Sequence, residues 1–211
     1  MIVTRDQVVQ WLELTAAVMK ENKDYLTQLD SPIGDADHGI NMDRGFRKVL
    51  EKLPSVADKD IGNILKTTGM TLISSVGGAS GPLYGTFFMR GGMAADAKEE
   101  LAGEDLAAIL QAGLDGLVQR GRAQVGDKTM IDAWTPALKA FHDALAAGGN
   151  ELLALQTSVN AAEQGMKDTI PLQARKGRAS YLGERSIGHQ DPGATSSYLM
   201  LKALLDTLES Q

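Results

Sequence analysis

Three aspartates lie close together in the stretch from residue 30 to residue 41, Asp-Ser-Pro-Ile-Gly-Asp-Ala-Asp-His-Gly-Ile-Asn. Asp30, Asp35 and Asp37 fall among a proline and two glycines, which break helices and strands, so we expect a loop here. Three like charges this close repel one another unless a cation lies between them. A divalent ion that prefers oxygen ligands, Mg²⁺ above all, suits such a set of carboxylates. The alternative is a solvated acidic loop, which His38 and Asn41 disfavour because they add polar groups within reach of phosphate oxygens.

Two other metal sites fit the sequence poorly. A calcium-binding EF-hand needs an acidic or amide side chain where Gly39 stands and a glutamate where Phe46 stands. A structural zinc site is disfavoured because the chain has no cysteine and only three histidines.

A second segment, Gly77-Gly78-Ala79-Ser80-Gly81, is a glycine-rich turn that precedes a helix with Pro82 in its first turn. Backbone amides in such a turn can approach an anion closely, and a helix N-terminus favours negative charge. Glycine-rich turns are common and most bind nothing. Opposite an acidic cluster, however, this glycine loop (residues 77–81) is typical of a phosphate cradle facing a magnesium site.

The segment from Gly121 to Thr129 comes close to a Walker A phosphate-binding loop. Asp127 separates its second glycine from Lys128, and no strand precedes it, so we reject that identity. Asp127 and Asp132 are interpreted instead as acids that cap the next helix.

A polar segment, residues 171–193, precedes the last helix, and we call it the flap. It carries a basic group in an otherwise acidic protein, namely Arg175, Lys176, Arg178 and Arg185. Such a group is usually a solvated surface or a docking surface. One of these arginines could instead fold over phosphates and stabilise charge during phosphoryl transfer. His142 and His189 are interpreted as incidental.

The elements that position these loops are predicted to be helices. Apolar residues recur at helical spacing and strand-like alternation is nearly absent. Eight helices are expected, over residues 5–29, 41–53, 60–76, 82–93, 105–120, 131–145, 151–168 and 194–208. If consecutive helices pack antiparallel, every second loop falls at the same end of the molecule. The acidic loop (residues 30–39), the glycine loop, the loop 121–129 and the flap are all odd-numbered, so they are expected to share one end. We therefore predict an all-α up-and-down barrel or bundle with a nucleotide site at one end.

Composition fits this view. The chain has 211 residues, enough for one domain spanning 1–211, with 43% hydrophobic and 23% charged residues. The absence of cysteine fits a reducing cytoplasm, and no signal peptide or membrane-spanning run is visible. A net charge of −6 argues against direct nucleic acid binding, but it is compatible with a nucleotide because a bound metal supplies positive charge.

Four segments, IGDADHGINM, GGASGPLYG, GDKTMIDAW and DPGATSSY, occur in this order over almost the whole chain. With this order and spacing, the sequence resembles the nucleotide-binding L subunit of dihydroxyacetone kinase, and closely the subunit of the bacterial enzyme that depends on the phosphotransferase system. The three metal-binding aspartates of that family match Asp30, Asp35 and Asp37. The resemblance implies an eight-helix antiparallel α-barrel, in agreement with the loop argument.

The resemblance also implies roles for individual residues. The three aspartates would hold two Mg²⁺ ions that bridge the phosphates of ADP or ATP, and with Arg178 they would carry the catalysis. The phosphates would be contacted by His38, Gly39, Ile40, Asn41, Ala79 and Ser80. The base and ribose would be lined by Gly121 and Met130, and the site would be closed by Arg178, Asp191, Pro192 and Gly193.

The resemblance further implies a phosphotransferase subunit that works with two others. A K subunit holds dihydroxyacetone covalently through a histidine, and a phosphohistidine on an M subunit recharges bound ADP to ATP. The γ-phosphoryl group then passes to the triose, with phosphoenolpyruvate as the ultimate donor.

Alternatives remain at this point. The chain could be a nucleotide-state sensor that binds a transcriptional regulator through the flap, or an L-like domain of an ATP-dependent triose kinase. A homodimer is also left open. A diphosphate lyase or prenyl synthase is disfavoured because only 5% of residues are aromatic and the acidic loop is broken by glycine and proline.

Overall fold

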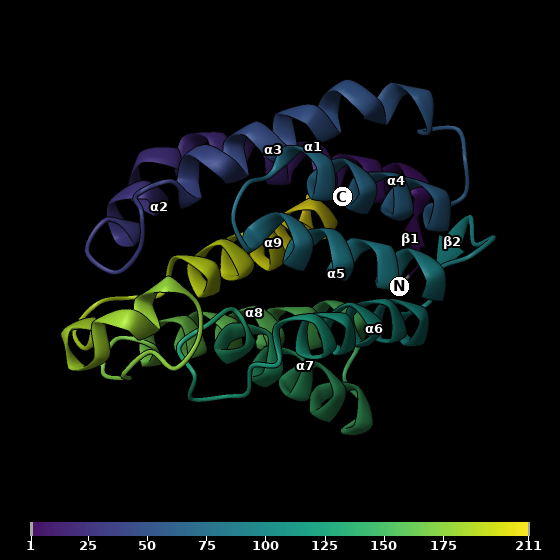
Figure 1. Cartoon of the computed structure of the whole chain (residues 1–211). Coiled ribbons are helices and arrows are strands. Elements are labelled where there is room, and N and C mark those ends of the chain that lie inside the picture. The colour runs from purple at the N-terminus through teal and green to yellow at the C-terminus, as the bar shows by residue number, and fades with distance from the viewer. Residues whose placement is uncertain (1, 211) are drawn as a thin grey trace.

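A computed structural model describes residues 2–210, which form a ring of helices (Figure 1). The α-helices are α1 (Arg5–Glu21), α2 (Lys23–Asp30), α3 (His38–Lys52), α4 (Ile61–Ser75), α5 (Ser80–Ala94), α6 (Gly103–Gly121), α7 (Ile131–Ala146), α8 (Glu151–Asp168) and α9 (Pro192–Glu209). Two 3₁₀ helices, η1 (Leu53–Ser55) and η2 (Arg178–Ser186), and two strands, β1 (Val3–Thr4) and β2 (Glu100–Leu101), complete the described elements.

The ring closes because the last helix packs against the first. From α3 onward each long helix packs on the next one along the chain, and α9 packs on both α8 and α1. The Trp11 indole on α1 donates a hydrogen bond to the Met200 carbonyl on α9, at 3.0 Å. The short α2 lies against α3 and α9. The prediction of an eight-helix antiparallel barrel is confirmed, with α1 and α2 together in the place of the first predicted helix.

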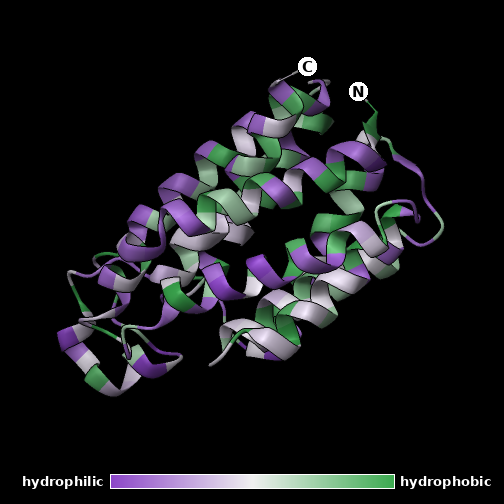
Figure 2. Cartoon of the chain, turned by 90° about the horizontal axis from the view of Figure 1, so that it is seen from above, coloured by the Kyte–Doolittle hydropathy of each residue, from purple (hydrophilic) through white to green (hydrophobic). Residues whose placement is uncertain are grey.

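The ring is held together by one large apolar core to which every long helix contributes. The stripe of apolar residues that repeats at helical spacing faces inward, while hydrophilic residues cover much of the outer surface (Figure 2). Aromatic side chains meet at the centre, where Phe88 contacts Trp11, Phe46 and Phe87, and Phe87 contacts Trp134 with ring centroids 4.6 Å apart. Each such pair adds about 0.5–1.5 kcal/mol beyond its buried area. Consequently the helix ends, rather than the helix middles, are free to carry chemistry.

The structure differs from the prediction at the N-terminal helix, which is not continuous over residues 5–29. It breaks at Asn22, where the side-chain amide donates to the Val18 carbonyl at 2.9 Å. Asparagine competes for backbone groups in this way and so favours helix ends. The break lets α2 turn toward α3 and deliver Asp30 to the loop that follows.

The prediction also missed a short antiparallel pair of strands. Val3 lies opposite Leu101 and Thr4 opposite Glu100. Strands of two residues carry no detectable alternation in the sequence. The pair lies at the end of the ring opposite the flap (Figure 1). Among residues 2–210, no helix combines the length and apolar character needed to cross a membrane.

Candidate functional site

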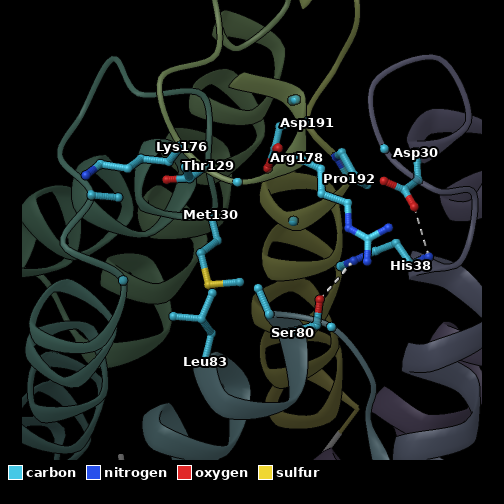
Figure 3. Close-up of a pocket in the computed structure, with 18 of the residues that line it drawn as sticks. Asp30, His38, Ser80, Leu83, Thr129, Met130, Lys176, Arg178, Asp191 and Pro192 are labelled. Atoms are coloured by element: carbon cyan, nitrogen blue, oxygen red, sulfur yellow. Dashed lines mark hydrogen bonds between the residues drawn. The ribbon is translucent and has the colours of Figure 1, made fainter. Parts of the chain in front are cut away.

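Four loops meet around one cavity of about 380 Å³ at one end of the ring (Figure 3). They are the acidic loop, the glycine loop, the loop 121–129 and the flap, as predicted from the order of the helices. The loops precede α3, α5, α7 and α9, so the N-termini of these four helices lie at the cavity end. Helix N-termini carry partial positive charge and free amides, which favour a bound anion such as a phosphate.

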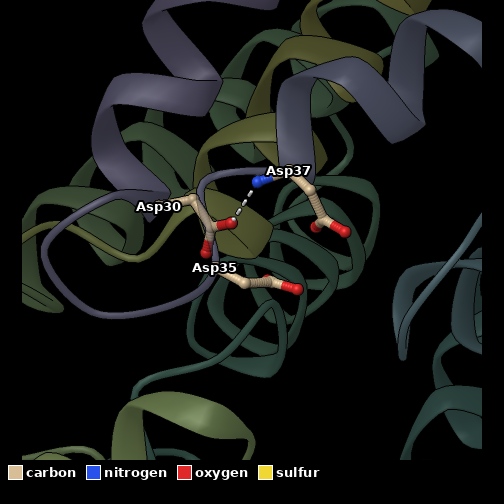
Figure 4. A group of neighbouring side chains, drawn as sticks. All are labelled: Asp30, Asp35 and Asp37. Atoms are coloured by element: carbon tan, nitrogen blue, oxygen red, sulfur yellow. Dashed lines mark hydrogen bonds between the residues drawn. The ribbon is translucent and has the colours of Figure 1, made fainter.

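The acidic loop folds around the Asp30 side chain, which is buried at the end of α2. Asp30 Oδ2 accepts hydrogen bonds from the backbone amides of Asp37, at 2.9 Å, and His38, at 3.2 Å. The loop therefore closes on itself and brings Asp35 and Asp37 beside Asp30 (Figure 4). One carboxylate oxygen from each of the three lies within 4.8 Å of the others. The predicted carboxylate cluster is thus present.

Gly34 is required for this close approach. A Cβ atom at this position would lie 1.9 Å from Asp30 Oδ1, far inside any real contact. The requirement is steric, because Gly34 is not among the described residues with positive φ. The glycine that breaks the sequence pattern thus makes room for the first carboxylate.

A cation already lies against this cluster, because the Arg178 guanidinium forms an ion pair with Asp35. Arg178 belongs to η2 of the flap, and its side chain is 61% exposed. It reaches into the cavity toward His38 and the glycine loop (Figure 3). The loop thus attracts positive charge, as the donor chemistry of three carboxylates requires.

The glycine loop leads into α5 at Ser80. No side chain of the described chain caps the first turn of this helix. Gly78 has φ +64°, a left-handed conformation that favours glycine, and a Cβ there would have no neighbour within 4 Å. The start of α5 therefore presents backbone amides to the cavity.

A chain of hydrogen bonds fixes His38 between the glycine loop and α9. Its Nδ1 lies 3.1 Å from Ser80 Oγ and its Nε2 lies 2.8 Å from Ser196 Oγ. The Tyr84 hydroxyl, in turn, lies 2.6 Å from Ser196 Oγ and donates to the Gly193 carbonyl at 3.1 Å. Burial lowers the pKa of His38 to about 4, although the charges of Asp30 and Asp37 act in the opposite direction. The imidazole is therefore neutral at pH 7 in the absence of ligand and acts as a hydrogen-bonding group.

The other side of the cavity carries an apolar patch among polar residues. Met130 at the start of α7 faces Leu83 on α5 (Figure 3), with Leu117, Ile131 and Gly121 beside them. A Cβ at Gly121 would lie 3.2 Å from Leu83 Cδ2, so the glycine leaves room along this wall. The cavity thus has an acidic side, built by the acidic loop, and an opposite side with an apolar patch suited to a flat ring.

Most of the predicted site residues line this cavity. They are Asp30, Asp35, Asp37, His38, Ala79, Ser80, Gly121, Met130, Arg178, Asp191, Pro192 and Gly193.

Three predicted residues lie outside the lining. Gly39 packs where a Cβ would meet the Lys23 carbonyl oxygen at 1.9 Å, and Ile40 is 48% exposed. Asn41 is buried behind the glycine loop, where its Oδ1 accepts from the Arg44 guanidinium at 2.5 Å. Asn41 therefore stands behind the site.

Several lining residues were missed by the sequence analysis, among them Leu83, Lys128, Thr129 and Lys176. For Leu83 a signal was available, because it follows Ser80 by nearly one helical turn and so lies above the same helix end. Lys128 had been set aside with the rejected Walker-like loop.

The interpretation of Asp127 and Asp132 as acids that cap the next helix is wrong, because both accept from loop amides before α7, whose N-cap residue makes no side-chain cap bond. Asp132 accepts from the amides of Gly126 and Thr129, at 2.5 and 2.7 Å, and Asp127 accepts from Gln124 at 2.9 Å. Asp191 caps α9 by accepting from Ala194 at 2.7 Å. Burial raises the pKa of Asp191 to about 7, so the carboxyl is near its titration point at neutral pH.

Residues 32–206 match the family described as the DAK2 domain. The chain belongs to the DAK2 family. Its sequence is 53% identical over 204 residues to the ADP-binding subunit DhaL of the PEP-dependent dihydroxyacetone kinase of Escherichia coli, covering 97% of both chains. It is 42% identical to the ADP-binding subunit DhaL of the PTS-dependent enzyme of Lactococcus lactis, covering 98% of this chain and 100% of that one.

A solved structure of a dihydroxyacetone kinase agrees in fold. The dihydroxyacetone kinase from C. freundii, in complex with AMP-PNP and Mg²⁺, superimposes with a TM-score of 0.69 and 29% identity. The match covers 97% of this chain and 34% of that one. Membership of the family and the helical ring are therefore established together, and the resemblance found in the sequence is confirmed.

Proposed function

We propose that the protein is the ADP-binding subunit of a dihydroxyacetone kinase that depends on the phosphotransferase system. It holds ADP at the cavity as a resident cofactor, accepts a phosphoryl group from a phosphohistidine on an M subunit, and delivers it to dihydroxyacetone on a K subunit. The observation that carries the proposal is the meeting of three carboxylates, four helix N-termini and an apolar wall in one cavity. The 53% identity to a subunit of that activity supports it.

The carboxylates fit Mg²⁺. All three ligands are oxygen donors, and the oxygens lie close enough to share a cation. Asp30 is held in place beside the other two carboxylates by two backbone amides that donate to its Oδ2. We infer that Asp30, Asp35 and Asp37 hold two Mg²⁺ ions, which would neutralise phosphate charge when bound. The all-carboxylate set and its opening toward the cavity suit ions that are shared with the nucleotide.

The remaining lining residues divide between phosphate and base. The amides of Ala79 and Ser80, at the start of α5 and next to His38, would contact the phosphates. Arg178 is the mobile cation: its ion pair with Asp35 can be exchanged for a phosphate oxygen once a metal occupies the carboxylates. The base and ribose would lie between Met130 and Leu83, beside Gly121.

Three residues predicted to contact the phosphates do not line the cavity. Gly39, Ile40 and Asn41 continue from His38 along α3. We propose that Asn41 supports the glycine loop from behind, since a Cβ at Gly77 would lie 3.2 Å from its Oδ1. Asp191, Pro192 and Gly193 would close the site as the start of α9.

The partners follow from the reaction. The K subunit must meet the cavity end, because the phosphoryl group has to pass directly from nucleotide to triose, and the M subunit must reach the same end. The exposed Tyr181 and Arg185 of the flap border that end and suit such contacts. We place the reaction in the cytoplasm. A transcriptional regulator or a second copy of the chain would compete for the same surface.

The proposal is tested by reconstitution. Purified protein is expected to carry ADP, released by EDTA, and to support triose phosphorylation from phosphoenolpyruvate when K, M and the general phosphotransferase proteins are added. Asp35→Asn is expected to reduce turnover at least about 100-fold while the helical circular dichroism spectrum is kept. Ser31→Ala, an exposed change in the same loop, is the control. Turnover near the wild-type value for Asp35→Asn would show the metal assignment to be wrong.

A further inference from the structure

Lys128 is a buried lysine at the edge of the nucleotide cavity. Its side chain is among the largest fully buried ones, at 1% exposure, which is rare for lysine unless its charge is satisfied. It belongs to the loop 121–129, which resembles a phosphate-binding loop in its spacing of glycines and lysine. The atoms around the ammonium decide whether it serves a phosphate or something else.

All the donors of this ammonium are directed to backbone carbonyls. Nζ donates to the carbonyls of Thr169, at 2.7 Å, Leu172, at 3.1 Å, and Ile170, at 3.4 Å. An ammonium has three N–H groups and no acceptor, so this set uses them all. The three carbonyls lie just beyond the C-terminus of α8, where the helix dipole favours a cation. Lys128 therefore binds the turn that joins α8 to the flap, together with Leu172 at the start of the flap.

The backbone of Lys128 indicates that the side chain is needed at this position. Its φ is +63°, in the left-handed region that glycine adopts readily. A residue with a side chain costs roughly 1–2 kcal/mol there. Glycine would remove that cost but would also remove the ammonium that joins these three carbonyls.

Both limbs of the flap are tied at the same point. The Asp127 carbonyl accepts from the Arg175 amide at 3.0 Å, next to Lys128 in the chain. On the returning limb, the Gly188 amide donates to the Ile170 carbonyl at 2.8 Å, and the Asp191 amide donates to Thr169 Oγ1 at 3.0 Å. Thr169 and Ile170 thus bind the returning limb and are themselves bound by Lys128. Between these anchored ends the flap carries Arg178 over the acidic loop.

We propose that Lys128 is a positioning residue for phosphoryl transfer, which anchors the base of the flap and thereby holds Arg178 over the carboxylate cluster. This inference rests on the proposed function for its kinetic consequence. Lys128 does not touch the nucleotide in this scheme. Its effect on turnover passes through Arg178.

A double-mutant cycle tests this in the reconstituted three-subunit system. Lys128→Met, Arg178→Ala and the double variant are compared with wild type for kcat, and the dissociation constant of Mg-ADP is measured by calorimetry. Lys128→Met alone is expected to lower kcat by about tenfold or more, whereas in the Arg178→Ala background it should change kcat less than about twofold. Equal losses in both backgrounds would overturn the proposal, because they would show that Lys128 supports the site independently of Arg178. Lys139→Met removes an exposed ammonium and is the matched control.

A second measurement does not depend on activity. Hydrogen exchange of the flap amides in the Mg-ADP complex is expected to rise in Lys128→Met, most clearly at Arg175, while exchange at the starts of α3 and α5 stays unchanged. Unchanged exchange in the flap would refute the anchor even if turnover fell. Should the wild-type system show no transfer at all, the proposed function fails and the exchange result still decides about the anchor.

A milder variant covers the case in which Lys128→Met does not fold. Ser186 is buried within the flap, where its Oγ accepts from the Ala174 amide at 2.9 Å and donates to the Gly183 carbonyl at 2.6 Å. Ser186→Ala loosens the flap without removing a buried charge. It is expected to follow the same cycle, with a loss of kcat that vanishes in the Arg178→Ala background. A loss that persists there would count against positioning through Arg178.

Discussion

Gly34→Ala tests whether the acidic loop is a metal site whose geometry requires a residue without a Cβ atom at position 34. The added Cβ would lie 1.9 Å from Asp30 Oδ1, about 1.5 Å short of the 3.4 Å at which ordinary contact begins. The Asp30 carboxylate cannot swing away freely, because Oδ2 is held by two backbone amides. The loop or the carboxylate must therefore move by about that distance.

A displacement of this size is large for Mg²⁺, which demands near-ideal octahedral geometry with bonds of about 2.0–2.1 Å. Disturbing the support of a metal ligand typically costs about 10–100-fold in affinity, which corresponds to about 1.4–2.8 kcal/mol. We expect at least this loss in Mg²⁺-dependent ADP binding. The free energy of unfolding should fall by about 1–3 kcal/mol, as for other overpacked sites.

The assay is calorimetric titration of ADP into metal-free protein at several Mg²⁺ concentrations, together with urea unfolding. Ser31→Ala, at an exposed position of the same turn, should leave both quantities within experimental error of wild type. If Gly34→Ala bound ADP with the wild-type dependence on Mg²⁺, the assignment of Asp30 as a metal ligand would be refuted.

Two further predictions concern the network behind the cavity. Tyr84→Phe keeps the aromatic ring but removes a buried hydroxyl that is bonded to Gly193, Ser196 and Ser197. The free energy of unfolding, measured by urea titration, should therefore fall by about 1–3 kcal/mol. Tyr181→Phe, at an exposed position, is the control, and an equal effect of the two substitutions would contradict the network. The raised pKa of Asp191 means that the folded protein binds its proton more tightly than the unfolded chain, so the stability of the ligand-free protein should decrease as pH rises from about 4 to about 7. Asp191→Asn retains a good helix cap and should flatten this decrease by a few kcal/mol at most; an unchanged pH profile would show that Asp191 is not responsible.

The position of the site could be predicted because it follows from the order of helices and loops along the chain. Once helices are recognised by their apolar spacing, antiparallel packing sends alternate loops to the same end, and the acidic, glycine-rich and basic segments all occupied alternate loops. The break at Asn22 was not predictable in the same way, because apolar residues continue across it at helical spacing and only one side-chain hydrogen bond interrupts them.

The role of Lys128 could not be predicted from the sequence. A lysine after a glycine-rich turn suggests a phosphate ligand, and only the three carbonyls from residues 169, 170 and 172 show where its donors go. Those carbonyls are about 40 positions away from Lys128 in the chain, so no local sequence pattern predicts the contact. Leu83 is the opposite case, because its helical spacing from Ser80 was enough to predict that it lies at the cavity.

The residues that line the cavity all lie at one end of the described ring, and that has a practical consequence for handling the protein. The β1–β2 pair, the start of α1 and the end of α9 all lie there, away from the cavity (Figure 1). An affinity tag, a fluorophore or a fused domain attached at either terminus would project from that end of the ring and leave the cavity at the opposite end accessible.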